Sequence, residues 1–235
     1  MHVAIVGAGA LGRVYGVRLA AAGTDVTFVV RASRMQESQP PLCIARVDGD
    51  KRQDELAAPR RSASVPAEAD VIVVCVRAEQ VDAPLERALA AAPDVPVVML
   101  TPLMPAALET LCHALGQRVV VAMPGVVAYV RNADRPGEEV TRYWLPRVAP
   151  TLIDETSRDA EVDSVTGLVD ALVKAGLPAR IEHGVRETNP ATTVSFIPLA
   201  MALDVAGGSD ALLADGALLA LAIEAARASA GVARA

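Results

Sequence analysis

The sequence has few of the residues that mark several common classes of protein. It contains only two lysines, Lys51 and Lys174, and three histidines far apart in the chain. Its three cysteines form no CxxC pair, so neither a disulfide framework nor a metal site is indicated. The formal net charge is −6, which argues against a nucleic-acid partner because such surfaces are rich in Lys and Arg.

The chain also lacks a segment typical of membrane insertion or export. Its longest apolar region, 211–226, is interrupted by Asp215 and Glu224 and is too short and too charged to span a bilayer. Met1 and His2 lead directly into an apolar run, so we expect no signal peptide. Together with the unpaired cysteines, this predicts a cytoplasmic protein.

Apolar residues make up 52% of the 235 residues, enough for a substantial core. Strand-like runs alternate with helical patterns, which predicts an α/β fold with a Rossmann-like, doubly wound, mostly parallel sheet. The expected strands lie at about 2–7, 25–30, 70–76, 95–100, 118–122, 151–154 and 179–181. The expected helices lie at about 10–22, 79–91, 105–115 and 159–175.

Two excursions interrupt this alternation. The first, 43–57, reads as a hairpin with its turn at Asp48-Gly49, and the second, 126–145, reads as a hairpin with its turn at 131–137. Both are expected to be insertions into the main α/β pattern.

The sequence becomes helix-rich from Gly184 onward. Pro190 and Pro198 are expected to interrupt the helices, and Gly207-Gly208 to divide two segments. We predict a cofactor domain over 1–183 and a short helical domain over 184–235. A segment of this size rarely holds a core alone, so a homodimer through it is expected.

A glycine motif follows the first apolar run and opens the first helical pattern. In Gly7-Ala8-Gly9-Ala10-Leu11-Gly12, the first glycine suits a tight turn, Gly9 leaves room for a pyrophosphate, and Gly12 allows close helix packing. This order predicts a dinucleotide site at the start of the helix. Its predicted binding residues here are Gly7, Gly9, Ala10, Leu11 and Gly12.

The second apolar run ends without a carboxylate. It is followed by Arg31 and Arg34, whereas folds that select NAD usually place Asp or Glu at this point to hold the ribose hydroxyls. Guanidinium groups suit the 2′-phosphate of NADP. The sequence therefore predicts NADP as the cofactor, with Arg31 and Arg34 as binding residues.

These features resemble the ketopantoate reductase family, within the 6-phosphogluconate dehydrogenase-like group of two-domain NADP oxidoreductases. The resemblance runs through the opening glycine motif, Val29 to Ala32, Asp48-Gly49, Val73 to Val81, Gly125 with its hairpin, and Ala175 to Pro178. It implies hydride transfer from NADPH to the carbonyl of a 2-keto acid, and a helical domain that is shortened here. It also implies cofactor contacts at Val76, Arg77, Thr101 and Pro102.

The chain departs from the family pattern at the substrate side. The resemblance implies an asparagine after the fourth main strand, where Thr101-Pro102 stands, and a general-acid lysine near Thr192. A threonine hydroxyl is a poor proton donor at neutral pH. The substrate site is therefore expected to be non-standard, with Thr192, Asn189 and Arg186 as replacement candidates for a small-molecule substrate.

Three functions remain open at this point. The first is an NADP-dependent oxidoreductase with an altered carbonyl or hydroxy-acid substrate. The second is hydride exchange with a deazaflavin, because Thr101-Pro102-Leu103 resembles the Ser-Pro-Leu-type loop of deazaflavin-NADP oxidoreductases. The third is a non-catalytic NADP-binding sensor or partner protein.

The Arg60-Arg61 pair lies in a polar connection, where solvated charge is the usual explanation.

Overall fold

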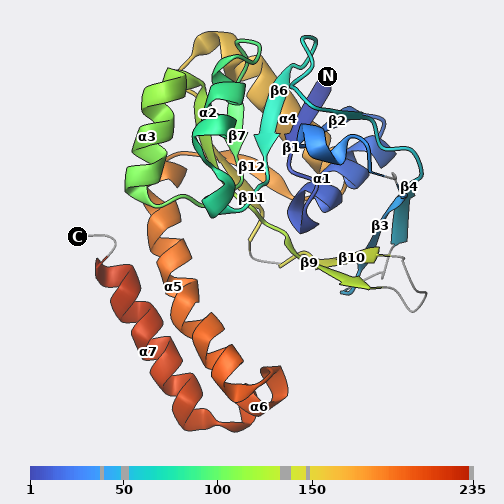
Figure 1. The fold of residues 1–235 in the computed structure, drawn as a ribbon. Helices are drawn as coiled ribbons and strands as arrows, with labels where there is room; N and C mark the ends of the chain where they lie inside the picture. The colour runs from blue at the N-terminus through green and yellow to red at the C-terminus, as the bar shows by residue number, and fades with distance from the viewer. Residues whose placement is uncertain (38–39, 49–52, 133–138, 147–148, 233–235) are drawn as a thin grey trace.

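The computed structural model describes residues 1–37, 40–48, 53–132, 139–146 and 149–232. In this part of the chain, an α/β domain carries a hairpin of long helices that extends away from it (Figure 1). The doubly wound, mostly parallel sheet predicted from the sequence is confirmed.

The main sheet has eight strands in the order β12-β11-β8-β7-β6-β1-β2-β5. Neighbouring strands are parallel except β8 and β11, which are antiparallel. The strands are β1 (His2–Val6), β2 (Asp25–Val29), β5 (Arg61–Ser62), β6 (Val71–Val74), β7 (Val97–Met99), β8 (Val119–Met123), β11 (Thr151–Asp154) and β12 (Ala179–Glu182).

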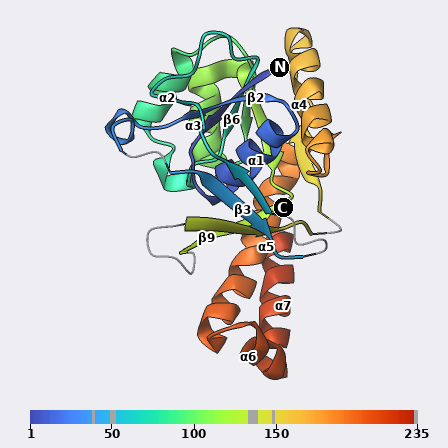
Figure 2. The same cartoon turned by 90° about the vertical axis from the view of Figure 1, so that its right-hand side faces the viewer.

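Helices cover both faces of this sheet, as the turned view in Figure 2 shows. Successive residues of β1 point to opposite faces, so Val3 and Ile5 join one core cluster while Ala4 and Val6 join the other. The first cluster includes residues of α1 and α4, and the second includes residues of α2 and α3. These helices are α1 (Ala10–Ala21), α2 (Ala83–Ala90), α3 (Pro105–Leu115) and α4 (Val162–Lys174).

The expected start of the second helix is wrong. Residues 78–80 form the 3₁₀ helix η2 (Ala78–Gln80), and α2 begins only at Ala83. The Asp82 carboxylate accepts a hydrogen bond from the Leu85 N–H at 3.0 Å, which caps the helix at this later position.

The two expected hairpins are present and pair with each other. They form a second sheet in the order β4-β3-β10-β9, in which β3 and β10 are parallel. The Asp48 carboxylate joins the hairpins because it accepts hydrogen bonds from Arg46 and from the Leu145 N–H. Gly49 of the first expected turn and residues 133–137 of the second lie outside the described residues. The strands are β3 (Leu42–Arg46), β4 (Gln53–Leu56), β9 (Val127–Asn132) and β10 (Glu139–Trp144).

Three helices follow β12: α5 (Val185–Ala206), α6 (Ser209–Ala214) and α7 (Gly216–Val232). The expectation that Pro190 and Pro198 interrupt the helix is wrong, because α5 runs through both. Each proline removes one helix hydrogen bond, and packing of α5 along α7 offsets that loss. The glycine pair ends α5 as expected, with Gly207 in the left-handed conformation at φ 77°.

Candidate cofactor and substrate site

Four neighbouring strands of the main sheet end at the same edge. Val6 of β1 pairs with Val29 of β2 and with Val74 of β6, and Val74 pairs with Met99 of β7. The segments that follow these strands carry most of the residues predicted to bind the cofactor. Ligands of open α/β sheets bind at this carboxyl edge, so the predicted residues lie where the fold favours a site.

The glycine loop has the shape that the motif predicts. Gly7 has φ +102°, and a Cβ on it would lie 2.9 Å from Val76 Cγ1. A Cβ on Gly12 would overlap the Gly7 carbonyl oxygen, so Gly12 is needed for the close approach of α1 to the loop. A Cβ on Gly9 would meet no atom within 4 Å. The space beside Gly9 is therefore open, as a bound pyrophosphate requires.

The amino end of α1 presents bare backbone donors at this opening. Gly9 is the N-cap and supplies no side chain, and the first turn contains no acidic residue. The first N–H groups of a helix, here including those of Ala10 and Leu11, lack partners within the helix. With the helix dipole they favour an anionic group.

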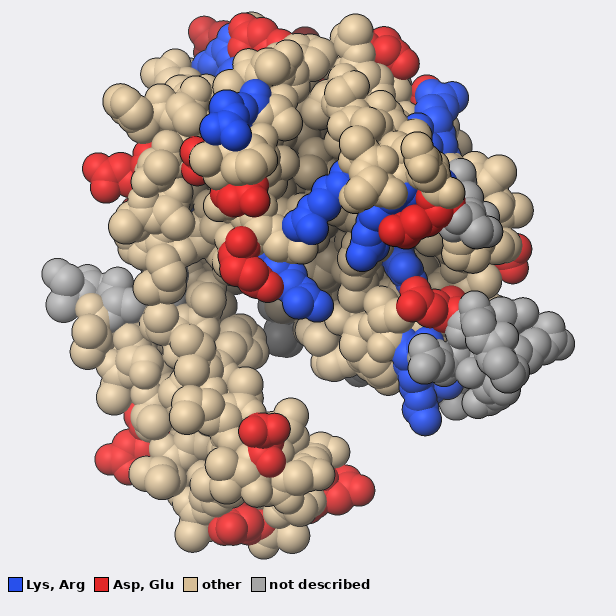
Figure 3. Space-filling view, in the orientation of Figure 1, with Lys and Arg blue, Asp and Glu red and all other residues tan. Residues whose placement is uncertain are grey.

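Arg31 and Arg34 lie on the exposed loop directly after β2. Arg31 precedes the 3₁₀ helix η1 (Ala32–Arg34), and the Arg34 N–H donates to the Arg31 carbonyl at 2.8 Å. Neither guanidinium makes a hydrogen bond or ion pair with a described residue. Figure 3 shows basic side chains gathered over the middle of this face of the α/β domain, and acidic ones on the end of the helical hairpin.

The residues after β6 and β7 have different surroundings. The buried Thr101 hydroxyl donates to the Val76 carbonyl at 2.7 Å, so it joins the two strand ends. Pro102 follows and is half-buried. The Arg77 side chain is 82% exposed, and its guanidinium lies 3.7 Å from the Glu79 carboxylate. Arg77 is therefore free to move toward a ligand at this edge.

One residue beside the glycine loop was not expected from the sequence. Arg13, in the first turn of α1, donates from Nε to the Ala8 carbonyl at 3.0 Å and from Nη1 to Glu139 of β10 at 2.8 Å. Arg13 therefore holds the glycine loop at the Ala8 carbonyl and connects the loop to the second sheet through Glu139. No motif indicates this role, because the partners are a backbone carbonyl and a carboxylate distant in the chain.

The helix α5 begins beside β8 and β11 of the main sheet. The Asp154 carboxylate accepts hydrogen bonds from the N–H groups of Val185 and Arg186 at 3.3 and 3.1 Å. Because Ile153 pairs with Ala122 in the antiparallel register, this start is level with the middle of β8. Asn189 lies about 6 Å further along the helix, and α5 extends away from the α/β domain from there (Figure 1).

Asn189 and Thr192 differ in what their side chains offer. Asn189 is 4% exposed, and its Oδ1 accepts a hydrogen bond from the Thr193 hydroxyl at 3.3 Å. No described residue accepts a hydrogen bond from its amide nitrogen. The Thr192 hydroxyl donates to the Thr188 carbonyl at 3.1 Å, within the helix. Of these two candidates, Asn189 is therefore the one whose side-chain amide nitrogen can still donate a hydrogen bond to a ligand.

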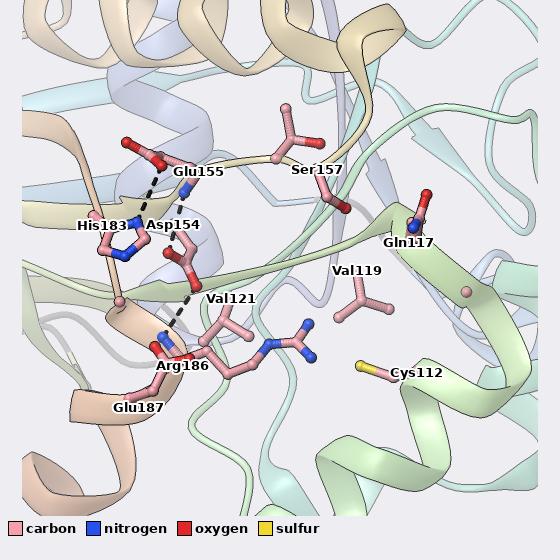
Figure 4. Close-up of a pocket in the computed structure, with 13 residues that line it drawn as sticks. Cys112, Gln117, Val119, Val121, Asp154, Glu155, Ser157, His183, Arg186 and Glu187 are labelled. Atoms are coloured by element: carbon pink, nitrogen blue, oxygen red, sulfur yellow. Dashed lines mark hydrogen bonds and ion pairs between the residues drawn. The ribbon is translucent and has the colours of Figure 1, made fainter.

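Arg186 lies apart from the cofactor residues. Its guanidinium points into a cavity of about 640 Å³ beside the Val119 end of β8, opposite to the edge of the glycine loop (Figure 4). The imidazole Nδ1 of His183 lies 3.1 Å from the Glu155 carboxylate at the rim of this cavity. That hydrogen bond and charge raise the pKa of the exposed His183.

A thiol lies beside the sheet edge at Cys75, directly after β6. Burial raises the pKa of the Cys75 thiol to about 12, so it is not a nucleophile in the folded protein. The described residues contain no cluster of three or more His, Cys, Asp or Glu side chains suited to a metal ion. Within the same described ranges, no helix has both the length and the apolar character to cross a membrane.

A parallel sheet with a glycine loop at its carboxyl edge, followed by a helical hairpin, defines a dinucleotide-binding α/β protein with a helical extension. Residues 3–138 match the family model described as ketopantoate reductase PanE/ApbA. The chain belongs to this family, and the resemblance read from the sequence is confirmed. Members of the family are oxidoreductases that act on CH–OH or C=O groups.

The individual relatives share only part of their length or a low sequence identity with this chain. A 2-dehydropantoate 2-reductase of Nostoc sp. strain PCC 7120 is 36% identical over 77 residues, which span 33% of this chain and 24% of that protein. The fold is similar to a crystal structure of 2-dehydropantoate 2-reductase from Geobacter metallireducens GS-15, with TM-score 0.65, 18% identity, and coverage of 100% of this chain and 82% of that one. It is also similar to D-mandelate dehydrogenase in a ternary structure with NADH and anilino(oxo)acetate, with TM-score 0.62, 17% identity, and coverage of 100% and 79%.

Proposed function

We propose that the protein is an NADP-dependent oxidoreductase that transfers a hydride between NADP(H) and a small 2-keto acid or the corresponding 2-hydroxy acid. One observation carries the cofactor part: the open amino end of α1 beside Gly9 lies at the same sheet edge as the guanidinium groups of Arg31 and Arg34, which have no partner among the described residues. Family membership and the name of the Nostoc relative support the substrate class.

The chain's own residues bind the cofactor in two places. The N–H groups of Ala10, Leu11 and Gly12 hold the pyrophosphate at the start of α1, where the helix dipole favours negative charge. Arg31 and Arg34 hold the 2′-phosphate with charge-assisted hydrogen bonds. The bound nicotinamide supplies or accepts the hydride.

On the substrate side, Asn189 orients the reacting group. Its amide nitrogen donates to the substrate oxygen, while the Thr193 hydroxyl holds Oδ1 and so fixes the direction of the amide. None of the candidates on α5 is an acid near neutral pH, so solvent water supplies the proton for reduction. We expect a slower reduction than a site with a lysine acid would allow, because a positioned acid typically contributes about 10²–10⁴-fold.

Fluorescence titration with NADPH and NADH tests the cofactor assignment. We expect NADPH to bind more tightly, and oxidation of NADPH at 340 nm to follow addition of one or more 2-keto acids from a panel of differing side chains. Asn189→Ala is expected to lower kcat for the accepted substrate without changing NADPH affinity, because Asn189 is assigned only to the substrate.

The same experiment separates the alternatives. NADPH oxidation by a deazaflavin but by no keto acid would favour hydride exchange between cofactors. Binding of NADPH without turnover over the whole panel would favour a sensor or partner protein. Absence of NADPH binding would overturn all three functions.

A further inference from the structure

Arg61 lies on a short strand that runs beside the predicted 2′-phosphate loop. In β5, Arg61 pairs with Phe28 of β2, and Ser62 pairs with Val29. The Val30 N–H donates to the Ser62 carbonyl at 2.9 Å, so the pairing continues to the residue before Arg31. The strand therefore ends where the loop with Arg31 and Arg34 begins.

The Arg61 side chain holds this loop at two points. Nη1 donates to the Arg34 carbonyl at 3.1 Å, and Nη2 donates to the Glu37 carbonyl at 3.0 Å. Its Nε is buried without a hydrogen-bond partner. The guanidinium makes no ion pair with a described carboxylate, so all the hydrogen bonds that it makes within the described chain go to the backbone of the loop.

The neighbouring arginine behaves differently. Arg60 is 57% exposed and pairs with Asp25 at the start of β2, where both side chains are largely in solvent. Its side chain makes no hydrogen bond or ion pair with the described residues of the loop. The two arginines that the sequence presents as one basic pair thus have separate surroundings, and Arg60 provides a matched control.

We propose that Arg61 is a positioning residue for the 2′-phosphate subsite and a determinant of the preference for NADP(H) over NAD(H). By fixing the Arg34 and Glu37 carbonyls, it orders the backbone from which the Arg31 and Arg34 side chains reach the phosphate. Without Arg61, the loop would lose conformational entropy when the ligand binds, and this cost would weaken only the binding of a ligand that uses the loop. This inference rests on the proposed function, because it presupposes that the loop binds a phosphate.

Lysine cannot replace arginine in this arrangement. The planar guanidinium presents two donors in a fixed geometry and reaches two carbonyls at once, whereas an ammonium is a compact charge on a flexible stem. Arg61→Lys retains the positive charge near the loop, and Arg61→Gln removes it. The two variants therefore separate the positioning of the loop from simple attraction of a phosphate.

The test compares Arg61→Gln and Arg61→Lys with the control Arg60→Gln. For each full-length variant, dissociation constants for NADPH and NADH are measured by fluorescence titration, that for adenosine 2′,5′-bisphosphate by calorimetry, and the melting temperature by circular dichroism. We expect Arg61→Gln to weaken NADPH and the bisphosphate about tenfold, as expected for loss of hydrogen bonds involving a charged group. NADH affinity should change less than about twofold, a difference well under that of one such hydrogen bond.

Arg61→Lys should also weaken NADPH selectively, and Arg60→Gln should leave both affinities unchanged. Equal weakening of NADPH and NADH by both Arg61 variants would overturn the inference and assign Arg61 a purely structural role. Unchanged NADPH affinity in Arg61→Lys would also overturn it, because charge alone would then suffice.

A separate variant distinguishes this failure from failure of the proposed function. If Arg31→Ala lowers the preference for NADPH but the Arg61 variants do not, only the role of Arg61 is wrong. If the wild-type protein shows no preference for NADPH, the assignment of the 2′-phosphate loop and the role of Arg61 both fall.

Discussion

The Arg18 guanidinium of α1 lies 3.0 Å from the Asp54 carboxylate of β4, and the two side chains are only 9% and 10% exposed. Arg18 also donates to the Ala175 carbonyl after α4. This pair connects the helix that starts at the glycine loop to the second sheet, at a distance from the loop itself. The inserted hairpins are therefore anchored on α1.

Replacing one partner of this pair should strongly destabilise the protein. Asp54→Asn leaves the buried Arg18 charge without its carboxylate, and we expect a loss of about 3–5 kcal/mol in the free energy of unfolding, measured by urea denaturation. The control is Asp25→Asn, which removes the exposed pair with Arg60 and should cost less than about 1 kcal/mol. Similar losses for both variants would contradict the buried character of the Arg18–Asp54 pair.

The two glycines of the loop should respond differently to alanine. Gly9→Ala places a methyl group in open space, so the melting temperature should stay the same while NADPH affinity falls. Gly12→Ala forces a clash with the Gly7 carbonyl and should lower the free energy of unfolding by about 1–3 kcal/mol. Thermal denaturation and fluorescence titration measure the two effects. Tight NADPH binding by Gly9→Ala would show that the pyrophosphate does not lie there.

Arg31→Ala should weaken NADPH about tenfold more than NADH, because it removes a charge-assisted hydrogen bond to the 2′-phosphate. The difference should shrink as salt is raised, since exposed charges are screened. Arg180→Ala is a suitable control: Arg180 is an exposed arginine on β12, at the opposite edge of the main sheet. Equal losses for the two cofactors would remove the reason for assigning NADP.

His183 should titrate above its ordinary pKa, because the Glu155 carboxylate stabilises the imidazolium. The raised pKa means that this pair contributes to stability at low pH, below the unfolded value of about 6.5. That contribution is lost as the pH rises through the higher folded value. NMR titration of the His183 ring proton should show a pKa that falls in Glu155→Gln. An identical pKa in both proteins would contradict the pairing.

The homodimer expected from the sequence stays a prediction, and α5 indicates where to test it. Ile197, Met201 and Val205 recur every four residues, and they are 51%, 63% and 75% exposed. Met201→Glu should convert a dimer into a monomer in light scattering coupled to gel filtration. Val173→Glu, at an exposed position on α4, should have no effect. A monomeric wild-type protein at tens of micromolar would refute the dimer.

Local patterns were enough to predict the parts of the fold that depend on neighbouring residues. The apolar runs of β1 and β2 and the glycine loop between β1 and α1 are where the sequence indicated. The parallel pairing of β3 with β10 was not foreseen, because it joins residues about a hundred positions apart and has no local signal. Asp82 as a helix cap and the unbroken α5 were likewise missed.

The candidate site divides in the same way. Arg31 and Arg34 could be selected because their position after the second strand has a known chemical meaning. Arg13 and Arg61 could not, since they act on the carbonyls of Ala8, Arg34 and Glu37, and every residue type has a carbonyl. Arg186 was grouped with Asn189 by proximity in sequence, but helix geometry directs it into a separate cavity.

The burial of Cys75 makes it a natural reporter of local opening. Its N–H donates to the Val6 carbonyl, its backbone lies against Gly7, and its side chain belongs to the core cluster that includes residues of α1, so labelling of the thiol requires local opening beside the glycine loop. Cys43 and Cys112 are half-buried and mark the faster background of modification by a thiol reagent. The labelling rate of Cys75 would therefore report how often the structure beside the glycine loop opens locally, and a bound dinucleotide should slow this labelling.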